Sequence, residues 1–555
     1  MRNPIVKLAS RLQNMIKVRS ALLAIFLGGA LVAQTPPVSA DQAFSTIKEI
    51  KDPAERADGF RKFLNDYSTS RPAHDLAGRE MVDAAIAASP GDSAKALGLA
   101  KDALKSLSGI SEAHVAAQFA DGLLAANLAL NDAEEFAKRA LQSFTYEAFK
   151  PYALSLPAAR RHVPSESSLH DQFTANQARI LNTLGQTQVK QGKTAAGKAS
   201  LEEALRKDPF MTETAYALAA LSQGGDQRLA YLTHGYLAHP AKADRLKLEA
   251  LYRTSHNNSL NGIEQYLDQQ YLKMLPKSAP LEAWRGNPRR TVLLELLTGS
   301  ACPPCLGMDR AFDQLMDRYP RNDLVVLMYH QNQGGPDPMT NYTTLNRFAY
   351  YNGVSAPTVI LAGNVELGGG LAERAPEFAA RLSGDVDAQL AIAAGAQIQL
   401  EGSLKGRDLQ VHVEADSIEQ HPASRLTLRL VVVDKEIHYS GETGVRFHPM
   451  VVRAMAEFPI ETSTSKSVRH TFNLDRIAAD LKEYHDDFER QESFISVKGK
   501  YERFNPDASY RWPNRLETIG TNGVAVAAFV QDDDTRKILQ AAYLDLAENR
   551  SGTHQ

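Results

Sequence analysis

The chain has 555 residues, more than one hydrophobic core organises, so we expect several domains. Hydrophobic residues make up 43% and charged residues 23%, which is the composition of an ordinary globular protein. The formal net charge of −3 excludes a general electrostatic attraction to nucleic acid, and we predict no nucleic-acid partner.

The first forty residues differ from the rest of the chain. They contain five basic residues and no acidic one, and an apolar run extends from Ala21 to Ala33. The run is shorter than the ~20 residues of a membrane-spanning helix, and Val38-Ser39-Ala40 offers the small residues of a cleavage site. We therefore predict a signal peptide over residues 1–40, the alternative being an uncleaved anchor. The mature chain is expected to be periplasmic or secreted, without a transmembrane helix.

Residues 41–285 are predicted to be α-helical, because alanine and leucine recur there at helical spacing. Between Leu181 and Pro209 the small and apolar residues fit two antiparallel helices with Gly192 at the turn. This segment resembles a tetratricopeptide unit, although Gln188 replaces the usual aromatic residue and Gly197 the usual alanine. The resemblance implies a helical-repeat region with a concave surface for a protein partner. The alternative is an irregular helical domain that binds nothing.

Between residues 286 and 387 the pattern alternates between strands and helices. We expect strands at 291–297, 323–329, 358–361 and 365–367, and helices at 302–318, 343–351 and 371–382. This order is typical of an α/β domain.

From residue 388 to 548 the apolar residues recur at every second position or form short runs. We expect strands at 396–400, 409–413, 426–433, 450–458, 467–474, 524–530 and 538–546, and a helix at 474–490. Seven short strands separated by turns predict an all-β sandwich of the immunoglobulin-like type.

The chain contains two cysteines, Cys302 and Cys305, with two prolines between them. A disulfide between positions so close closes too short a loop to stabilise the fold, so we interpret the pair as reactive. Cys302 would stand at a helix N-terminus, where free N–H groups and the helix dipole stabilise a thiolate. We assign Cys302 as the attacking, solvent-accessible thiol and Cys305 as the buried, resolving one.

The segment LELLTGSACPPC (294–305), together with SAPT (355–358), resembles the thioredoxin superfamily. The resemblance implies that Pro357 follows a cis peptide bond and faces the dithiol, and that the backbone of Ala356 pairs with a bound substrate. Ala301 stands where the family usually has tryptophan. Glu295 lies one residue from the usual buried acid, which makes it a candidate for proton transfer with Cys305. The alternative places Glu295 on the solvent edge of its strand.

The layout after residue 288 is also similar to secreted bacterial proteins that join a thioredoxin-like domain to an immunoglobulin-like tail. Some of these proteins are associated with the outer membrane, and the segment 441–455 carries the likeness. The resemblance therefore implies a location in or near the cell envelope.

These features predict an exported thiol–disulfide oxidoreductase that acts on protein thiols and disulfides and needs no cofactor beyond the Cys302–Cys305 disulfide. The alternative is an envelope scaffold or assembly protein with a non-catalytic thioredoxin-like module. We expect no metal site, because a structural zinc takes four ligands and the chain has no second cysteine pair. His330 and Asp337 are the residues that a metal site beside the dithiol would require.

Overall fold

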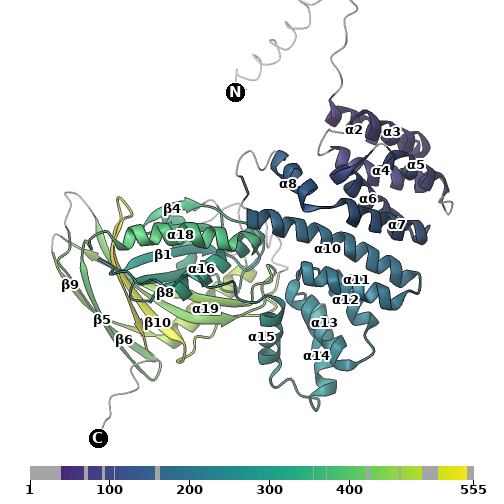
Figure 1. The fold of residues 1–555 in the computed structure, drawn as a ribbon. Coiled ribbons are helices and arrows are strands. Elements are labelled where there is room, and N and C mark those ends of the chain that lie inside the picture. The colour runs from purple at the N-terminus through teal and green to yellow at the C-terminus, as the bar shows by residue number, and fades with distance from the viewer. Residues whose placement is uncertain are drawn as a thin grey trace, which may run out of the picture.

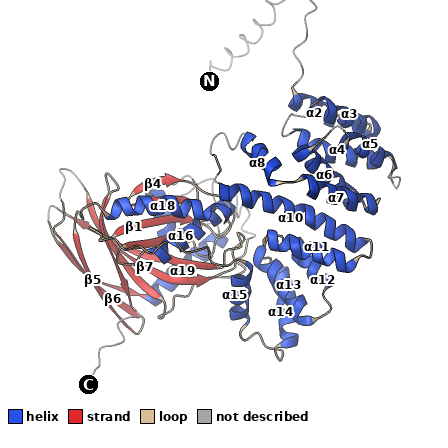
Figure 2. Cartoon of the chain, viewed as in Figure 1, coloured by secondary structure: helices blue, strands red, loops and turns tan. Residues whose placement is uncertain are grey.

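The computed structural model describes residues 39–67, 73–90, 94–105, 107–156, 163–164, 166–353, 355–370, 372–419, 425–461, 464–490 and 510–546. The expected signal peptide therefore lies outside the described residues except for its last two. Within the described ranges, no helix has the length and apolar character needed to cross a membrane. The chain has a helical N-terminal half and a C-terminal half built on a mixed sheet (Figures 1 and 2).

The N-terminal half is a row of helices in which most consecutive helices pack against each other (Figure 1). The helices are α2 (Ala40–Lys48), α3 (Pro53–Asp66), α4 (Ala73–Ala88), α5 (Ala94–Leu104), α6 (Gly109–Ala126), α7 (Leu130–Ser143), α8 (Tyr146–Ser155), α10 (Glu166–Lys190), α11 (Thr194–Lys207), α12 (Thr212–Leu221), α13 (Gly225–Ala238), α14 (Lys242–Ser255) and α15 (Ile263–Met274). The expectation of a helical region is confirmed.

The hairpin of α10 and α11 explains two unusual residues of the predicted repeat unit. A Cβ atom on Gly197 would lie 2.8 Å from the carbonyl oxygen of Gly185, so the two helices touch through their backbones and alanine does not fit. Gln188 is buried and donates to Glu134 of α7 at 3.1 Å. At the position where a tetratricopeptide unit usually has an aromatic residue, Gln188 thus joins the hairpin to the preceding helices by a polar contact.

The predicted α/β unit forms one end of an 8-stranded sheet with the order β11-β10-β7-β8-β2-β1-β3-β4. Its elements are β1 (Val292–Thr298), the turn η1 (Pro303–Cys305), α16 (Leu306–Arg318), β2 (Leu324–His330), α17 (Tyr342–Tyr350), β3 (Thr358–Leu361), β4 (Asn364–Leu367), η2 (Ala372–Arg374) and α18 (Ala375–Leu390). Strand β1 pairs in parallel with β2 and antiparallel with β3, which pairs antiparallel with β4.

The helices of this unit lie on both faces of the sheet. Thr298 of β1 bonds to Asp309 of α16, whereas Glu295 of the same strand bonds to Arg347 of α17. Residues three apart on a strand point to opposite faces, so α16 and α17 cover opposite sides. Helix α18 packs against α16.

The β-rich part differs from the separate sandwich that the sequence predicted. Four of its strands, β7 (Leu426–His438), β8 (Phe447–Ile460), β10 (Val524–Asp532) and β11 (Ile538–Asp545), continue the sheet of the α/β unit. The strands β5 (Gln397–Lys405), β6 (Asp408–Asp416) and β9 (Lys466–Asn473) form a second sheet, and α19 (Leu474–Arg490) follows it. The expected boundary at 387/388 falls inside α18.

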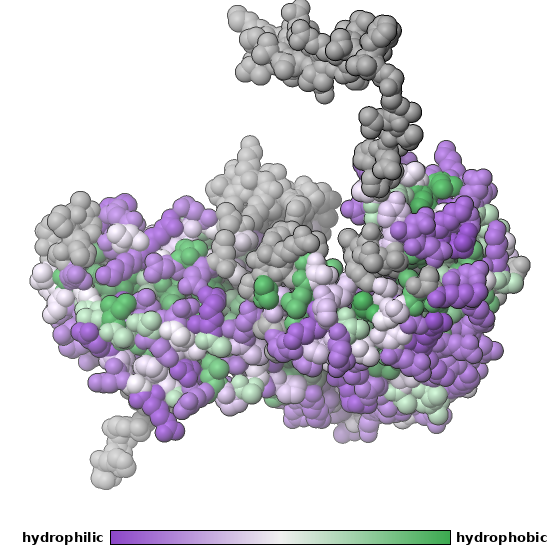
Figure 3. Space-filling view, turned by 45° about the horizontal axis from the view of Figure 1, so that its top comes forward, coloured by the Kyte–Doolittle hydropathy of each residue, from purple (hydrophilic) through white to green (hydrophobic). Residues whose placement is uncertain are grey.

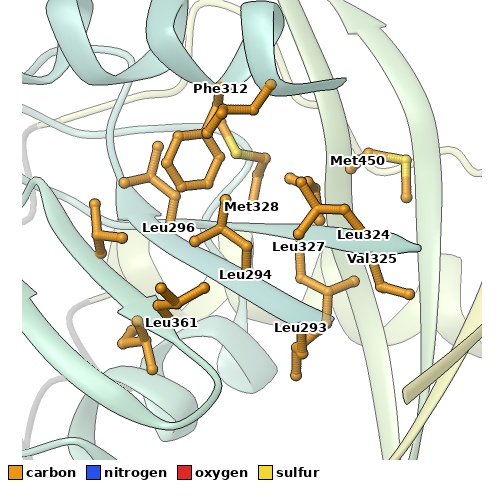
Figure 4. Close-up of a cluster of buried hydrophobic side chains, with 14 of the residues drawn as sticks. Leu293, Leu294, Leu296, Phe312, Leu324, Val325, Leu327, Met328, Leu361 and Met450 are labelled. Carbon is orange, nitrogen blue, oxygen red and sulfur yellow. The ribbon is translucent and has the colours of Figure 1, made fainter. Parts of the chain in front are cut away.

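The continuous sheet follows from burial on both faces of β7. Val431 and Val433 pack into the core of the α/β unit, whereas Leu430 and Val432 pack against the second sheet. Figure 4 shows Met450 of β8 in one cluster with side chains of β1, β2 and α16. A strand buried on both sides needs a layer on each face, so these strands serve both cores.

On the surface drawn in Figure 3, hydrophobic residues lie scattered among hydrophilic ones.

A buried ion pair joins α17 to both parts of the sheet. Arg347 donates to the two carboxylate oxygens of Glu295 at 2.8 Å, and the hydroxyl of Tyr351 donates to the same carboxylate at 2.9 Å. Arg347 also donates to Gln531 of β10, which accepts a further bond from Arg429 of β7 at 3.1 Å. The guanidinium of Arg347 therefore bridges strands that the sequence assigned to two domains.

The ion pair gives a stability prediction. Arg347→Met leaves the carboxylate of Glu295 buried without its cation, and we expect the free energy of unfolding to fall by about 3–5 kcal/mol in urea titrations. Arg381→Met is the matched control, because Arg381 pairs with Glu366 at the surface and its loss should cost less than about 1 kcal/mol. Equal losses in the two variants would contradict the importance of the buried pair.

Candidate functional site

Cys302 and Cys305 form a disulfide where the chain passes from β1 to α16. Strand β1 ends at Thr298, and Pro303–Cys305 make one 3-10 turn before the α-helix begins at Leu306. The two prolines suit this position, because proline has a helical φ and lacks only an N–H that the first turn leaves unpaired. Both cysteines thus stand at the N-terminal end of α16.

A loop around Pro357 lies against the disulfide. The peptide bond between Ala356 and Pro357 is cis, as the resemblance implied. The carbonyl oxygen of Ala356 lies 3.5 Å from Sγ of Cys302, and both cysteines and Ala356 form one small buried cluster. A Cβ on Gly369 would lie 2.6 Å from the ring of Pro357, so the glycine loop before η2 closes tightly over this side.

The exposure of the two cysteines agrees with the sequence prediction for one and differs for the other. Cys305 is 0% exposed, as expected, whereas Cys302 is 2% exposed and is not the solvent-accessible group that the helix-start argument predicted. The loop after β2 packs against it: a Cβ added to Gly334 would overlap the carbonyl group of Ala301 and lie 3.4 Å from Cα of Cys302. A glycine-built cover of this kind gives no hydrophobic pattern in the sequence.

Glu295 lies on the α17 face of β1, opposite the face that α16 covers. Its carboxylate is 0% exposed, so the alternative of a solvent-edge acid is wrong. Its oxygens accept bonds from Arg347 and Tyr351, and this arrangement does not favour proton transfer with Cys305.

A different acid, Asp309, lies on the same side of the sheet as the dithiol. It follows Cys305 by four positions on α16, a spacing that places two side chains on one helix face about 5–6 Å apart at Cβ. Thr298 donates to its carboxylate at 2.7 Å. Burial raises the pKa of Asp309 to about 7, although the bond from Thr298 acts in the opposite direction. The spacing of four positions from Cys305 is visible in the sequence.

His330 and Asp337 form a second buried polar pair beside the dithiol loop, the segment from the end of β1 to Cys302. Nδ1 of His330 lies 2.7 Å from the carboxylate of Asp337, which also accepts from the backbone N–H of Ser300 at 2.7 Å. Burial raises the pKa of Asp337, but His330 and the hydrogen bonds outweigh it, and the pKa lies below its ordinary value. The pair holds the backbone two residues before Cys302.

No group of three or more histidine, cysteine or acidic side chains suited to a metal ion occurs among the residues that the structure describes. His330 and Asp337 bind each other at the end of β2.

The fold and the site define a protein with a helical half and a mixed-sheet half that carries a buried disulfide at a helix start. No protein-family model matches the chain, and no curated protein matches it. Among solved structures, the chain is similar to HBP35 of Porphyromonas gingivalis, with 16% sequence identity, coverage of 49% of this chain and 80% of that chain, and a TM-score of 0.32.

Asp309 gives a prediction about pH. Its pKa in the folded protein, about 7, exceeds its ordinary value of 3.8, so its contribution to stability is present below about pH 4 and is lost as the pH rises toward 7. Asparagine resembles the protonated acid and does not titrate. Burial also raises the pKa of Asp313, one turn further on α16, to about 7, so part of the decline belongs to that residue. The free energy of unfolding of Asp309→Asn, measured by urea titration from pH 4 to 8, should therefore show a smaller decline than the parent protein, by an amount on the order of a few kcal/mol.

The control is Asp317→Asn, which changes an exposed aspartate on the same helix and should keep the parent's decline. Identical pH dependence in the parent protein and in Asp309→Asn would show that Asp309 is not held in its protonated form.

Proposed function

We propose that this chain is an exported thiol–disulfide oxidoreductase and that residues 286–387 form its thioredoxin-like unit. The observation that carries the proposal is the disulfide at the N-terminus of α16, with the carbonyl group before cis-Pro357 3.5 Å from Sγ of Cys302. The order β2-β1-β3-β4, with helices after β1, β2 and β4, supports the assignment of the unit. We also propose the division of the rest of the chain into a signal peptide, a helical region (41–285) and a β-rich part (388–548).

In the reductive direction, the thiolate of Cys302 attacks one sulfur of a substrate disulfide and forms a mixed disulfide, and the other substrate sulfur leaves as a thiolate. Cys305 then attacks Sγ of Cys302, releases the second substrate thiolate and closes the Cys302–Cys305 disulfide. Two electrons pass to the substrate, and oxidation of a substrate dithiol is the same sequence in reverse. The backbone beside Ala356 is the proposed site for the substrate segment.

We assign the proton acceptor for Cys305 to Asp309 rather than to Glu295. Asp309 lies one helical turn after Cys305, and its pKa of about 7 suits both uptake and release of a proton near neutral pH. It also lines a pocket of about 220 Å³ between α15, α16 and the start of β8, which supplies a route for the proton to reach solvent.

Catalysis of disulfide exchange is the direct test. The mature chain should accelerate the reduction of insulin by dithiothreitol, whereas a chain with both Cys302→Ser and Cys305→Ser should not. Equilibration with glutathione then gives the reduction potential, and a value near ~−270 mV indicates a reductant whereas one near ~−120 mV indicates an oxidant. An insulin rate equal to that of the double variant would remove the enzymatic assignment.

The alternative is an envelope scaffold or assembly protein whose thioredoxin-like module is not catalytic. The burial of Cys302 favours it, because exchange requires a sulfur that a partner thiol can reach. On this alternative the disulfide persists unchanged, and partners bind the helical region without covalent intermediates.

Trapping of mixed disulfides distinguishes the two functions. Cys305→Ser leaves Cys302 able to attack but removes the thiol that resolves the adduct, so disulfide-linked partners should accumulate in the cell envelope. Non-reducing gels followed by mass spectrometry measure the adducts. Chains with Cys302→Ser, alone or with Cys305→Ser, should trap none. Partners captured by the chain only without covalent bonds would favour the scaffold.

A further inference from the structure

A short segment between β7 and β8, residues 439–446, connects the helical region to the dithiol loop, and we call it the strap. The strap is closed on itself by backbone bonds. Tyr439 donates to the carbonyl group of Arg446 at 2.9 Å, Gly441 donates to Val445 at 2.9 Å, and Gly444 donates to Gly441 at 2.9 Å. It is therefore a turn held together by its own backbone bonds.

One side of the strap rests on the segment before Cys302. The N–H of Thr443 donates to the carbonyl oxygen of Ser300 at 3.1 Å. Gly441 packs so closely on Ser300 that an added Cβ would lie 2.7 Å from the same oxygen. The tip residue Glu442 stands near Gly335, which packs on Ala301. Ser300 is thus held by the strap through its carbonyl group and by Asp337 through its N–H.

The other side of the strap is bound by the helical region. The buried guanidinium of Arg446 forms ion pairs with Glu264 at 2.8 Å and with Asp268 at 2.6 Å, both on α15. Gly444 packs against the ring of Phe210, which precedes α12. Figure 1 shows α15 at the end of the sheet, between the strands and the other helices. Arg446 is therefore the charged link between the helical region and the strap.

The helical region reaches the dithiol at a second point, where α10 contacts η2 just after the glycine loop on Pro357. The disulfide is consequently flanked by two segments that the helical region holds in place. These two segments add to the loop after β2, which packs on Ala301 and Cys302, and Cys302 is 2% exposed although it stands at a helix start.

We propose that the strap is a specificity-determining element that controls which thiols reach Cys302. While Arg446 holds it to α15, the approach to the disulfide is too narrow for a folded protein thiol, and small thiols react in preference. Release of Arg446 lets the strap withdraw from Ser300 and opens the disulfide to protein-sized partners. The inference rests on the proposed function, because it takes Cys302 as the reacting sulfur.

The experiment measures how fast two reductants of different size open the Cys302–Cys305 disulfide of the full mature chain. The reductants are dithiothreitol and reduced thioredoxin, and the product is counted by alkylation of the freed thiols. Because exchange rates depend on access, Arg446→Ala should raise the rate with thioredoxin by about tenfold and the rate with dithiothreitol by less than about threefold. Arg446→Lys, which keeps a cation near α15, should give an intermediate rate with thioredoxin.

Arg245→Ala is the matched control. Arg245 pairs with the same Glu264 at 2.8 Å, but from α14 within the helical region, and the change should leave both rates near those of the parent. A chain with Glu264→Gln and Asp268→Asn removes the partners while keeping Arg446, and should reproduce the effect of Arg446→Ala. If Arg446→Ala does not fold, this second variant decides the outcome.

Unchanged thioredoxin rates, or equal acceleration with both reductants, would overturn the strap as a size filter. The readout is a single opening of the disulfide and needs no turnover. If insulin is not reduced but Arg446→Ala accelerates thioredoxin more than dithiothreitol, the strap inference stands and the proposed enzyme is removed. If insulin is reduced but Arg446→Ala shows no such difference, the proposed enzyme stands and the strap inference is removed.

Discussion

The carboxylate of Asp337 is the contact on which the geometry of the dithiol depends. It is fully buried, and it accepts bonds from the N–H of Ser300 and from Met339 while pairing with His330. A buried carboxylate is stable as a charge only when its oxygens are satisfied in this way. The N–H of Ser300 is thereby bound to the loop after β2. The carbonyl oxygen of Ser300 accepts a bond from Thr443 of the strap. The position of the disulfide is set by distant segments rather than by the CPPC sequence itself.

The same dependence on distant segments holds for the sheet. Strand β1 is buried along its whole length, and β2 has β1 on one side and meets β8 on the other at Met328 and Val451. Without β7 and β8, the side chains of β2 would lose the part of their core that Val431, Val433 and Met450 supply. Arg347 adds a polar link across the same junction through Gln531. The thioredoxin-like unit of our proposal is therefore one end of a larger folded body.

The sequence predicted the elements well where the pattern is local. Strand β3 and helix α19 have the predicted bounds, and the dithiol, the helix start and the cis bond at Pro357 followed from short motifs. The sheet that crosses residue 388 was missed, although the nearly continuous apolar run 426–433 is typical of a strand buried on both faces. The partner of Glu295 lies 52 positions away on α17, and no local signal identifies it. The cover over Cys302 was missed because glycine backbones form it.

A buried disulfide can still react if a small fraction of the molecules has the cover withdrawn at equilibrium. The strap touches Ser300 through Gly441 and through one backbone hydrogen bond, so its withdrawal breaks few side-chain contacts. On the other side, the side chain of Arg446 is 2% exposed and pairs with both Glu264 and Asp268, so the strap withdraws only when both pairs break. Opening therefore requires Arg446 to leave both carboxylates, and only a minor open population is expected in equilibrium with the closed form. A protein thiol that reacts only with the open form is slowed by the size of that population, whereas a small thiol is not. Selectivity by size then arises from the position of one equilibrium, which the helical region sets through Arg446.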